Sequence, residues 1–167
     1  MRRKKIIIGS RNSKLALIYA NKAKAEIDYI KSDYGVEEIT IKEITTAGDL
    51  NQKIRLSELG GKGLFSTKIE NELLNKKIDL AVHALKDMPS DETEGLLTNC
   101  FLERNDPREV LISANNQNIE DLEPKSIIGT SSFRREFQLK RKRNDLNYKL
   151  IRGNVDTRIK KLSDGLY

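Results

Sequence analysis

The same short pattern occurs twice in the chain, and it constrains the fold more than any other feature. Ile7-Ile8-Gly9-Ser10 and Ile127-Ile128-Gly129-Thr130 each place two apolar residues, a glycine and a hydroxyl residue in a row. The apolar pair is typical of the end of a buried strand, the glycine lets the backbone turn, and Ser or Thr favours the start of a helix. We therefore predict two similar α/β units, each with a helix N-terminus that faces a ligand.

Hydroxyl and basic residues follow the second copy of this pattern. Thr130-Ser131-Ser132 precedes the predicted helix, and Arg134 and Arg135 lie in its first turn. An arginine in a first turn opposes the positive end of the helix dipole, at a cost of roughly 0.3–1 kcal/mol. This charge is explained if an anion binds there. Two solvated arginines on a helix surface are the alternative.

Hydrophobic periodicity predicts the elements of the first unit. These are a strand at 5–8, a helix at 14–31, a strand at 38–44, a turn at 45–49, a helix with Phe65, Ile69 and Leu73 on one stripe, and a buried strand at 78–85. The glycine-rich stretch Leu59–Gly63 predicts a mobile or tightly turning loop. It lacks the spacing of a phosphate-binding P-loop. Lys62 in this loop either contacts an anionic ligand or is solvated.

Lys86 and Asp87 directly follow the predicted strand at 78–85. Ligands of open parallel sheets bind beyond the carboxyl ends of the strands. Asp87 is therefore a candidate acid–base group beside a lysine, with a strand-end ion pair as the alternative. His83, the single histidine, is expected inside the strand, as a packed core residue rather than a catalyst.

The second unit is predicted to contain three strands and two helices. The strands are expected at 109–113, at 127–128 and at 148–152, and a polar connection at 114–124 holds a helical turn at 119–122. One helix is expected to run through Arg143, and the other follows Gly153-Asn154. The strand ends and helix starts then bring together Arg134, Arg135, Arg152 and Arg158, with Arg11 opposite. Such a cluster would require several carboxylates or phosphates, and the planar fork of arginine suits carboxylates.

The charge balance points to an anionic partner without naming it. The 167 residues include 31 Lys and Arg against 25 Asp and Glu, a net charge of +6. Nucleic acid, a membrane surface and a polycarboxylate ligand remain open on this ground alone. The basic end of the predicted helix, at 140–143, is interpreted mainly as a solvated last turn, because no nucleic-acid fold signature accompanies it.

One cysteine excludes an internal disulfide and suits a reducing cytosol. Cys100 lies beside Phe101 and Leu102 and is expected to be buried or half-buried. The basic N-terminus is followed by only three isoleucines before Gly9, too few for a signal peptide or a membrane span. We therefore predict a cytosolic protein.

Several motifs in order resemble one family, that of porphobilinogen deaminase (hydroxymethylbilane synthase), from Ile6 to the last residue. The matching segments are Ile8–Leu17, Thr46–Asp49, Gly60–Phe65, Asp79–Pro89, Asp106–Arg108, Gly129–Arg135 and Ile151–Arg158. The resemblance implies three domains, the first two being periplasmic-binding-protein-like α/β units around a cleft. It assigns 1–102 to domain 1 and 103–167 to an incomplete domain 2, with the third domain absent.

The resemblance also implies a transferase of tetrapyrrole (heme) biosynthesis. The reaction joins four porphobilinogen molecules head to tail with loss of ammonia, on a dipyrromethane cofactor. The acetate and propionate groups of each pyrrole would account for the arginines. The implied protein is a cytoplasmic monomer whose partners are porphobilinogen and the growing polypyrrole, with no nucleic acid, membrane or metal.

Family roles transfer to residues that match the motifs. Asp87 takes the catalytic position, stabilising positive charge on a pyrrole nitrogen and shuttling protons. The cofactor-binding positions are Ser13, Lys86, Asp87, Thr130, Ser131, Ser132, Arg134, Arg135 and Arg158. The substrate-binding positions are Arg11, Arg152 and Arg158, and Lys62 and Phe65 match the mobile loop beside the cleft.

Two departures from the family pattern bear on activity. Ala84 stands where the family usually has serine, and the cysteine that holds the dipyrromethane belongs to the third domain, which Cys100 does not match. We therefore expect a truncated chain that is inactive alone. The alternative function is a non-catalytic anion-binding module of periplasmic-binding-protein type, which would use the same arginines without needing Asp87.

Overall fold

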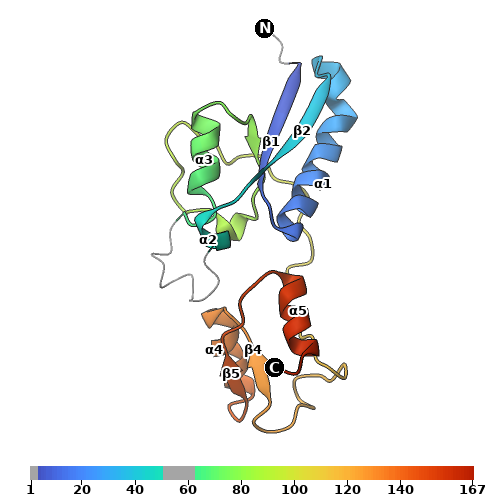
Figure 1. Cartoon of the computed structure of the whole chain (residues 1–167), viewed down its shortest axis with the longest axis vertical. Coiled ribbons are helices and arrows are strands. Elements are labelled where there is room, and N and C mark those ends of the chain that lie inside the picture. Colours follow the sequence, from blue (N-terminus) through green and yellow to red (C-terminus); the bar gives the residue numbers. More distant parts are fainter. Residues whose placement is uncertain (1–3, 51–62) are drawn as a thin grey trace. The chain divides into compact units, whose positions relative to one another are not determined.

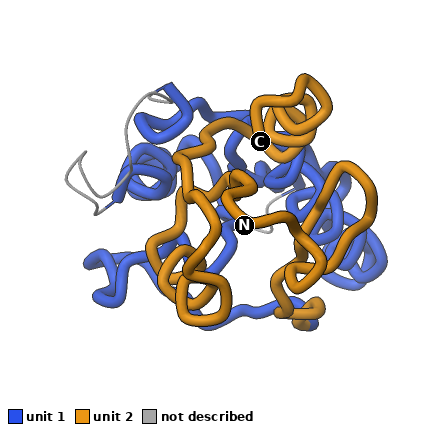
Figure 2. Tube along the Cα trace, turned by 90° about the horizontal axis from the view of Figure 1, so that it is seen from below, with its two compact units in different colours: residues 1–103 blue, residues 104–167 orange. Residues whose placement is uncertain are grey.

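The computed structural model describes residues 4–50 and 63–167. The chain divides into two compact units, residues 1–103 and 104–167, which Figure 2 distinguishes by colour. Both are of mixed α/β type, and each contains a parallel sheet. The sequence prediction of an α/β fold is confirmed at this level. Among the described residues, no helix combines the length and apolar character needed to cross a membrane.

A three-stranded parallel sheet forms the centre of the first unit (Figure 1). Its strands are β1 (Lys5–Arg11), β2 (Glu38–Ile44) and β3 (Leu80–Ala81), in the order β2-β1-β3. Ile8 is the register partner of Ile41 on one side and of Leu80 on the other. All three strands run parallel, so their carboxyl ends meet at one edge of the sheet.

Helices pack against this sheet through small and branched apolar residues. Helix α1 (Lys14–Ile30) contacts β1 and β2 and buries Ala20 and Ala23, and the 3₁₀ turn η1 (Lys31–Tyr34) continues it. Helix α3 (Thr67–Leu74) contacts β3 and β1 and contributes Ile69 to a core cluster with Ile44 and Ile78. Gly9 is needed at this core, because an added Cβ would lie 2.3 Å from Cδ1 of Ile78.

The predicted strand at 78–85 is much shorter in the structure. Beyond β3, only the Val82 N–H continues the pairing, donating to the Gly9 carbonyl at 3.0 Å. The chain then forms the 3₁₀ turn η3 (Leu85–Asp87), so His83 lies between strand and turn rather than within a strand. The apolar run was a poor guide to strand length, because a strand extends only as far as a neighbouring strand faces it, and the β1–β3 register covers two residue pairs. The predicted turn at 45–49 contains the single helical turn α2 (Ala47–Leu50).

The second unit has a two-stranded parallel sheet and two helices. Strand β4 (Ile127–Gly129) pairs with β5 (Asn147–Lys149), with Ile128 opposite Tyr148. Helix α4 (Phe133–Lys142) follows β4, and helix α5 (Val155–Ser163) follows β5. The predicted strand at 148–152 thus ends earlier, at Lys149.

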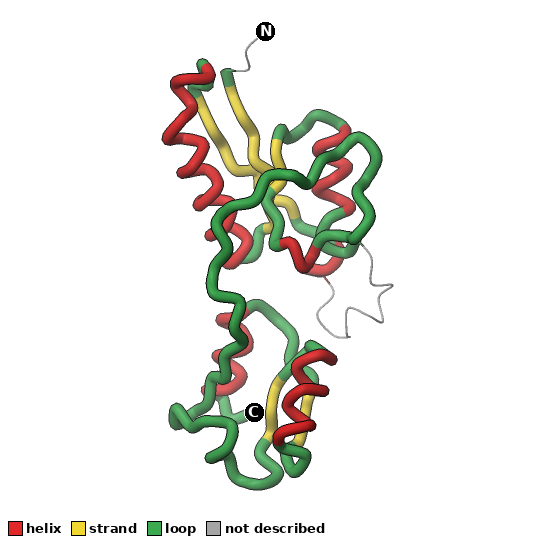
Figure 3. The backbone as a smooth tube through the Cα atoms, turned by 180° about the vertical axis from the view of Figure 1, so that it is seen from behind, coloured by secondary structure: helices red, strands yellow, loops and turns green. Residues whose placement is uncertain are grey.

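The predicted strand at 109–113 is wrong. This segment belongs to the long irregular stretch drawn as loop in Figure 3, and its Val110 is 82% exposed. A strand requires a neighbour for its backbone N–H and C=O groups, and no strand of the described residues pairs with this one. Residues 119–121 form a hydrogen-bonded turn, as expected near 119–122. Cys100 is exposed, which corrects the expectation of a buried thiol.

Candidate functional site

Arg11 is the centre of the polar site in the first unit. It is the last residue of β1, and its side chain is only 17% exposed. Its Nε lies 3.1 Å from Oδ1 of Asp49, and its Nη1 lies 3.6 Å from Oδ2 of Asp87. Asp49 follows β2 and Asp87 follows β3, so the carboxyl ends of three neighbouring parallel strands supply this cluster.

Asp49 fixes the position of Arg11. Its Oδ2 accepts hydrogen bonds from the Thr46 backbone N–H at 3.0 Å and from the Thr46 hydroxyl at 2.7 Å. Burial by itself raises the pKa of Asp49, but the hydrogen bonds from Arg11 and Thr46 outweigh it and hold the pKa below its ordinary value. Asp49 is therefore a permanent anion that orients the guanidinium. The sequence reasoning noted the Thr46–Asp49 motif but gave Asp49 no role.

Phe65 covers the guanidinium of Arg11. The Arg11 Cζ lies 3.8 Å from the centroid of the Phe65 ring, within the range of a cation–π contact. Gly48 permits this, because an added Cβ would lie 2.2 Å from the ring. Phe65 precedes α3 rather than lying on it, since the helix begins at Thr67. Lys62, the other residue of the predicted mobile loop, lies outside the described residues.

Asp87 is half-buried in the turn η3. Its side chain is 23% exposed, and its backbone N–H donates to the Ala84 carbonyl at 2.9 Å. The cation beside Asp87 is Arg11, whereas the side chain of Lys86 is exposed. The structure thus presents a carboxylate that a ligand can reach, next to an arginine that Asp49 holds in place.

His83 is half-buried close to these charges. Its Nε2 has no hydrogen-bond partner among the described residues. Burial lowers the pKa of His83, and the Arg11 charge acts in the same direction, while Glu70 and Asp87 oppose the shift. His83 is therefore a neutral imidazole over most of the physiological range.

Ser13 has a structural role that the helix-start pattern predicted. Its hydroxyl accepts a hydrogen bond from the Ala16 backbone N–H at 3.3 Å and caps α1. The cap uses an acceptor site of the oxygen and leaves the O–H able to donate to a ligand.

The hydroxyl run of the second unit forms a similar cap. Thr130 is buried, its N–H donates to the Lys149 carbonyl at 3.0 Å, and its Oγ1 accepts from the Ser132 N–H at 3.2 Å. Ser132 in turn caps α4 by accepting from the Arg135 N–H at 3.3 Å. Ser131 is half-buried between them. These hydrogen bonds fix the first turn of α4, from which the side chain of Arg135 extends.

Glu109 pairs with both arginines in the first turn of α4. Its Oε2 lies 2.6 Å from Nη2 of Arg135, and its Oε1 pairs with Nη2 of Arg134. The hydrogen bond from Arg134, followed by that from Arg135, holds the pKa of Glu109 below its ordinary value. Sequence reasoning missed Glu109 because it lies 25 positions before Arg134 in a segment predicted to be a strand.

Arg135 also belongs to a cationic cluster with Arg152 and Arg158. All three are half-buried, and Arg158 donates from Nε to the Gly153 carbonyl at 2.8 Å. Burial lowers the pKa of Arg158, and the charges of Arg152 and Arg135 lower it further. The buried Nε of Arg135 has no hydrogen-bond partner among the described residues. Concentrated positive charge of this kind favours an anionic ligand.

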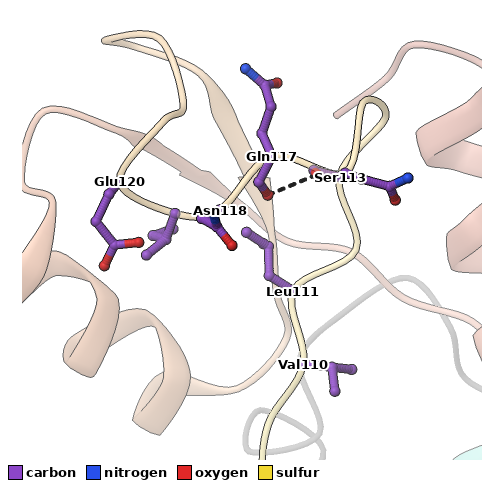
Figure 4. A pocket seen from close by; sticks show the side chains of 8 residues that line it. Val110, Leu111, Ser113, Gln117, Asn118 and Glu120 are labelled. Carbon is purple, nitrogen blue, oxygen red and sulfur yellow. Dashed lines mark hydrogen bonds between the residues drawn. The ribbon is translucent and has the colours of Figure 1, made fainter.

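A hollow elsewhere in the second unit does not suit such a ligand. It has a volume of about 440 Å³, and Figure 4 shows the hydrogen bond that the Ser113 hydroxyl donates to the Gln117 carbonyl at its edge. None of its lining side chains is cationic, and Glu120 is acidic. The lining residues are Val110, Leu111, Ser113, Asn116, Gln117, Asn118, Ile119 and Glu120.

Comparison with known proteins identifies the family. The profile of "Porphobilinogen deaminase, dipyromethane cofactor binding domain" matches residues 6–167. The chain belongs to this family. The porphobilinogen deaminase of Bacillus mycoides (strain KBAB4) is 49% identical over 164 residues, which are 98% of this chain and 52% of that protein. The porphobilinogen deaminases of Bacillus cereus (strain B4264) and Bacillus thuringiensis (strain Al Hakam) are each 48% identical, again over 98% of this chain and 52% of the relative. The chain thus spans about half the length of the curated relatives it matches.

The described residues fit the dipyrromethane cofactor of the porphobilinogen deaminase family. A dipyrromethane of this family carries several carboxylates, and the second unit offers three half-buried arginines; the buried Nε of Arg135 has no hydrogen-bond partner among the described residues. Arginine forks bind carboxylates bidentately, so the donor set matches the ligand chemistry. Among the described residues no group of His, Cys, Asp and Glu is arranged to hold a metal ion.

Proposed function

We propose that the chain is part of a hydroxymethylbilane synthase, which joins four porphobilinogen molecules head to tail with loss of ammonia. Family membership supports the reaction class. The structural observation that carries the proposal is the cationic cluster of Arg135, Arg152 and Arg158, whose charges repel one another. A ligand with several negative groups would relieve this repulsion.

Each predicted site residue has a role in this proposal. The cofactor is held by Ser13, Lys86, Asp87, Thr130, Ser131, Ser132, Arg134, Arg135 and Arg158, and the substrate carboxylates are bound by Arg11, Arg152 and Arg158. When bound, dipyrromethane supplies the pyrrole end to which porphobilinogen units are added. The arginines bind and orient carboxylates, while the O–H groups of Ser13 and Thr130 donate hydrogen bonds, because their accepting sites serve the helix caps and turn.

Asp87 is proposed as the catalytic carboxylate. An anion beside a pyrrole N–H stabilises positive charge that develops on the ring, and it can take up and return a proton. Asp49 holds Arg11 through the shorter contact, and Asp87 meets Arg11 only at 3.6 Å. The remaining exposure of the Asp87 side chain, 23%, gives a ligand access to the carboxylate.

We further propose that residues 1–102 are domain 1 of the family and 103–167 part of domain 2, each of periplasmic-binding-protein type. The two compact units and their parallel sheets support this assignment. A cytoplasmic monomer that acts without nucleic acid is part of the same proposal.

A chimeric protein tests the function. Residues 1–167 replace the matching part of the Bacillus mycoides relative, and ammonia release from porphobilinogen is measured. We expect turnover in the chimera, its loss by about 10²–10⁴-fold in Asp87→Asn, and full turnover in the control Asp91→Asn, an exposed acid of the same segment. A folded chimera that binds the cofactor but gives no turnover would instead support a non-catalytic anion-binding module.

A further inference from the structure

Glu109 occupies a position that a ligand carboxylate would need. Its two oxygens pair with Arg134 and Arg135, the two cations at the start of α4. An arginine fork that already holds one carboxylate has fewer donors left for another. A ligand carboxylate that binds these arginines must therefore compete with Glu109.

The local structure makes Glu109 easy to displace. It lies in a stretch without helix or strand, all residues from 101 to 112 are exposed, and its own side chain is 42% exposed. Exposed ion pairs contribute little free energy, so exchanging one carboxylate for another is nearly balanced. Asp106, another acid of this loop, pairs with Arg108 instead. Glu109 is thus the loop carboxylate that reaches the helix start.

We propose that Glu109 is an exchangeable internal counter-ion that raises the affinity threshold of the arginine site, so that only ligands with several carboxylates bind well. A monocarboxylate that displaces Glu109 only replaces the contacts that Glu109 made with Arg134 and Arg135. It must also compete with Glu109 itself, whose effective concentration is high because it belongs to the same chain. A polycarboxylate gains additional contacts with Arg152 and Arg158, so it displaces Glu109 with net benefit. Glu109 is therefore a specificity residue, and this inference rests on the proposed function of the arginine cluster.

Calorimetric titration of the 167-residue chain at low ionic strength tests the inference, with citrate as the tricarboxylate probe and acetate as the monocarboxylate. Glu109→Gln keeps the shape of the side chain and removes its charge. We expect the Kd for citrate and the Kd for acetate both to fall about two- to tenfold, because both ligands displace the same carboxylate. Asp106→Asn is the matched control, because it removes the same charge from the same loop without freeing Arg134 or Arg135.

A double-mutant cycle tests whether Glu109 acts on citrate binding through Arg134 and Arg135. In an Arg134→Gln, Arg135→Gln background, Glu109→Gln should no longer change citrate binding, because the cations that it neutralises are gone. The Arg Nε–Hε resonances of Arg134 and Arg135 provide a second measurement. With saturating citrate, the parent and Glu109→Gln should show the same positions for these resonances, because Glu109 is displaced from the arginines in the parent complex.

Two results would overturn the inference. One is a citrate Kd in Glu109→Gln that equals or exceeds that of Asp106→Asn, and the other is an acetate Kd that Glu109→Gln leaves unchanged. Failure of the proposed function has a different signature. In that case Arg158→Gln would bind citrate as tightly as Arg141→Gln, which removes an exposed arginine from the last turn of α4.

Discussion

Replacement of Asp49 by Asn tests whether this carboxylate holds the polar site of the first unit together. Asp49 accepts hydrogen bonds from the Arg11 guanidinium and from the backbone and hydroxyl of Thr46. Its side chain is 13% exposed and that of Arg11 is 17% exposed, so solvent screens the pair weakly. Asparagine keeps one acceptor oxygen but loses the charge and the second acceptor.

The magnitude follows from these contacts. Hydrogen bonds to a charged group contribute about 1.5–3 kcal/mol each, against about 0.5–1.5 for neutral ones. Breaking a fully buried ion pair costs about 3–5 kcal/mol. Residual exposure and the second acid, Asp87, reduce this cost, so we expect Asp49→Asn to lower the free energy of unfolding of the first unit by about 2–4 kcal/mol.

The effect should depend on pH in a defined direction. The folded-state pKa of Asp49 lies below its ordinary value of 3.8, so its stabilisation is complete above that value. The stabilisation is lost as the pH falls from the ordinary value through the folded-state pKa, because over that interval the unfolded chain binds more protons than the folded one. The difference between parent and Asp49→Asn should therefore be constant near neutral pH and shrink in strong acid.

Amide hydrogen exchange gives the assay, because it reports each unit separately. Exchange at Ile8 and Ile39, both buried in the sheet, measures the opening of the first unit. Asp28→Asn is the control, since Asp28 forms only partly buried surface pairs with Lys24 and Lys31, and we expect a change of less than about 0.5 kcal/mol there. An Asp49→Asn effect below about 0.5 kcal/mol would refute the role given to Asp49.

Three further predictions concern other parts of the chain. Burial lowers the pKa of His83 below 6.5, so the parent should lose stability relative to His83→Gln as the pH is lowered from about 8 to about 5; a constant difference would contradict this. Gly48→Ala should lower the free energy of unfolding by about 1–3 kcal/mol, because the new Cβ would lie 2.2 Å from the Phe65 ring; an unchanged Tm counts against it. Arg143→Lys should speed amide exchange at 119–122, because the guanidinium donates to three carbonyls of that turn, and unaltered exchange there would show that the turn holds without it.

Local sequence patterns were sufficient where the interactions are local. Ser13 and Ser132 each accept a hydrogen bond from a backbone N–H three residues later, so the hydroxyl before an apolar periodic segment marked both helix starts. The alternation at 38–44 likewise predicted β2 with its observed bounds. Ile127-Ile128-Gly129 forms β4 and ends it, as the repeated pattern predicted, whereas β1 continues past the predicted end at Ile8 to Arg11.

Strand lengths could not be predicted in the same way. The apolar runs at 78–85 and 109–113 have the composition of strands, yet the first pairs over two residues and the second pairs with no described strand. A strand exists only where another strand offers its N–H and C=O groups in register. The sequence of the strand itself contains no information about whether that partner is present.

The sequence by itself determined two α/β units, their helix starts and the residue types suited to a polycarboxylate. Only the tertiary structure decided which charges meet. Asp49 lies 38 positions from Arg11 and Glu109 lies 25 positions from Arg134, so no periodicity links either pair. Parallel strands bring their carboxyl ends to one edge and thereby place Arg11 between Asp49 and Asp87. Distances between charges depend on chain topology, whereas sequence spacing controls them only within a helix turn or along a strand.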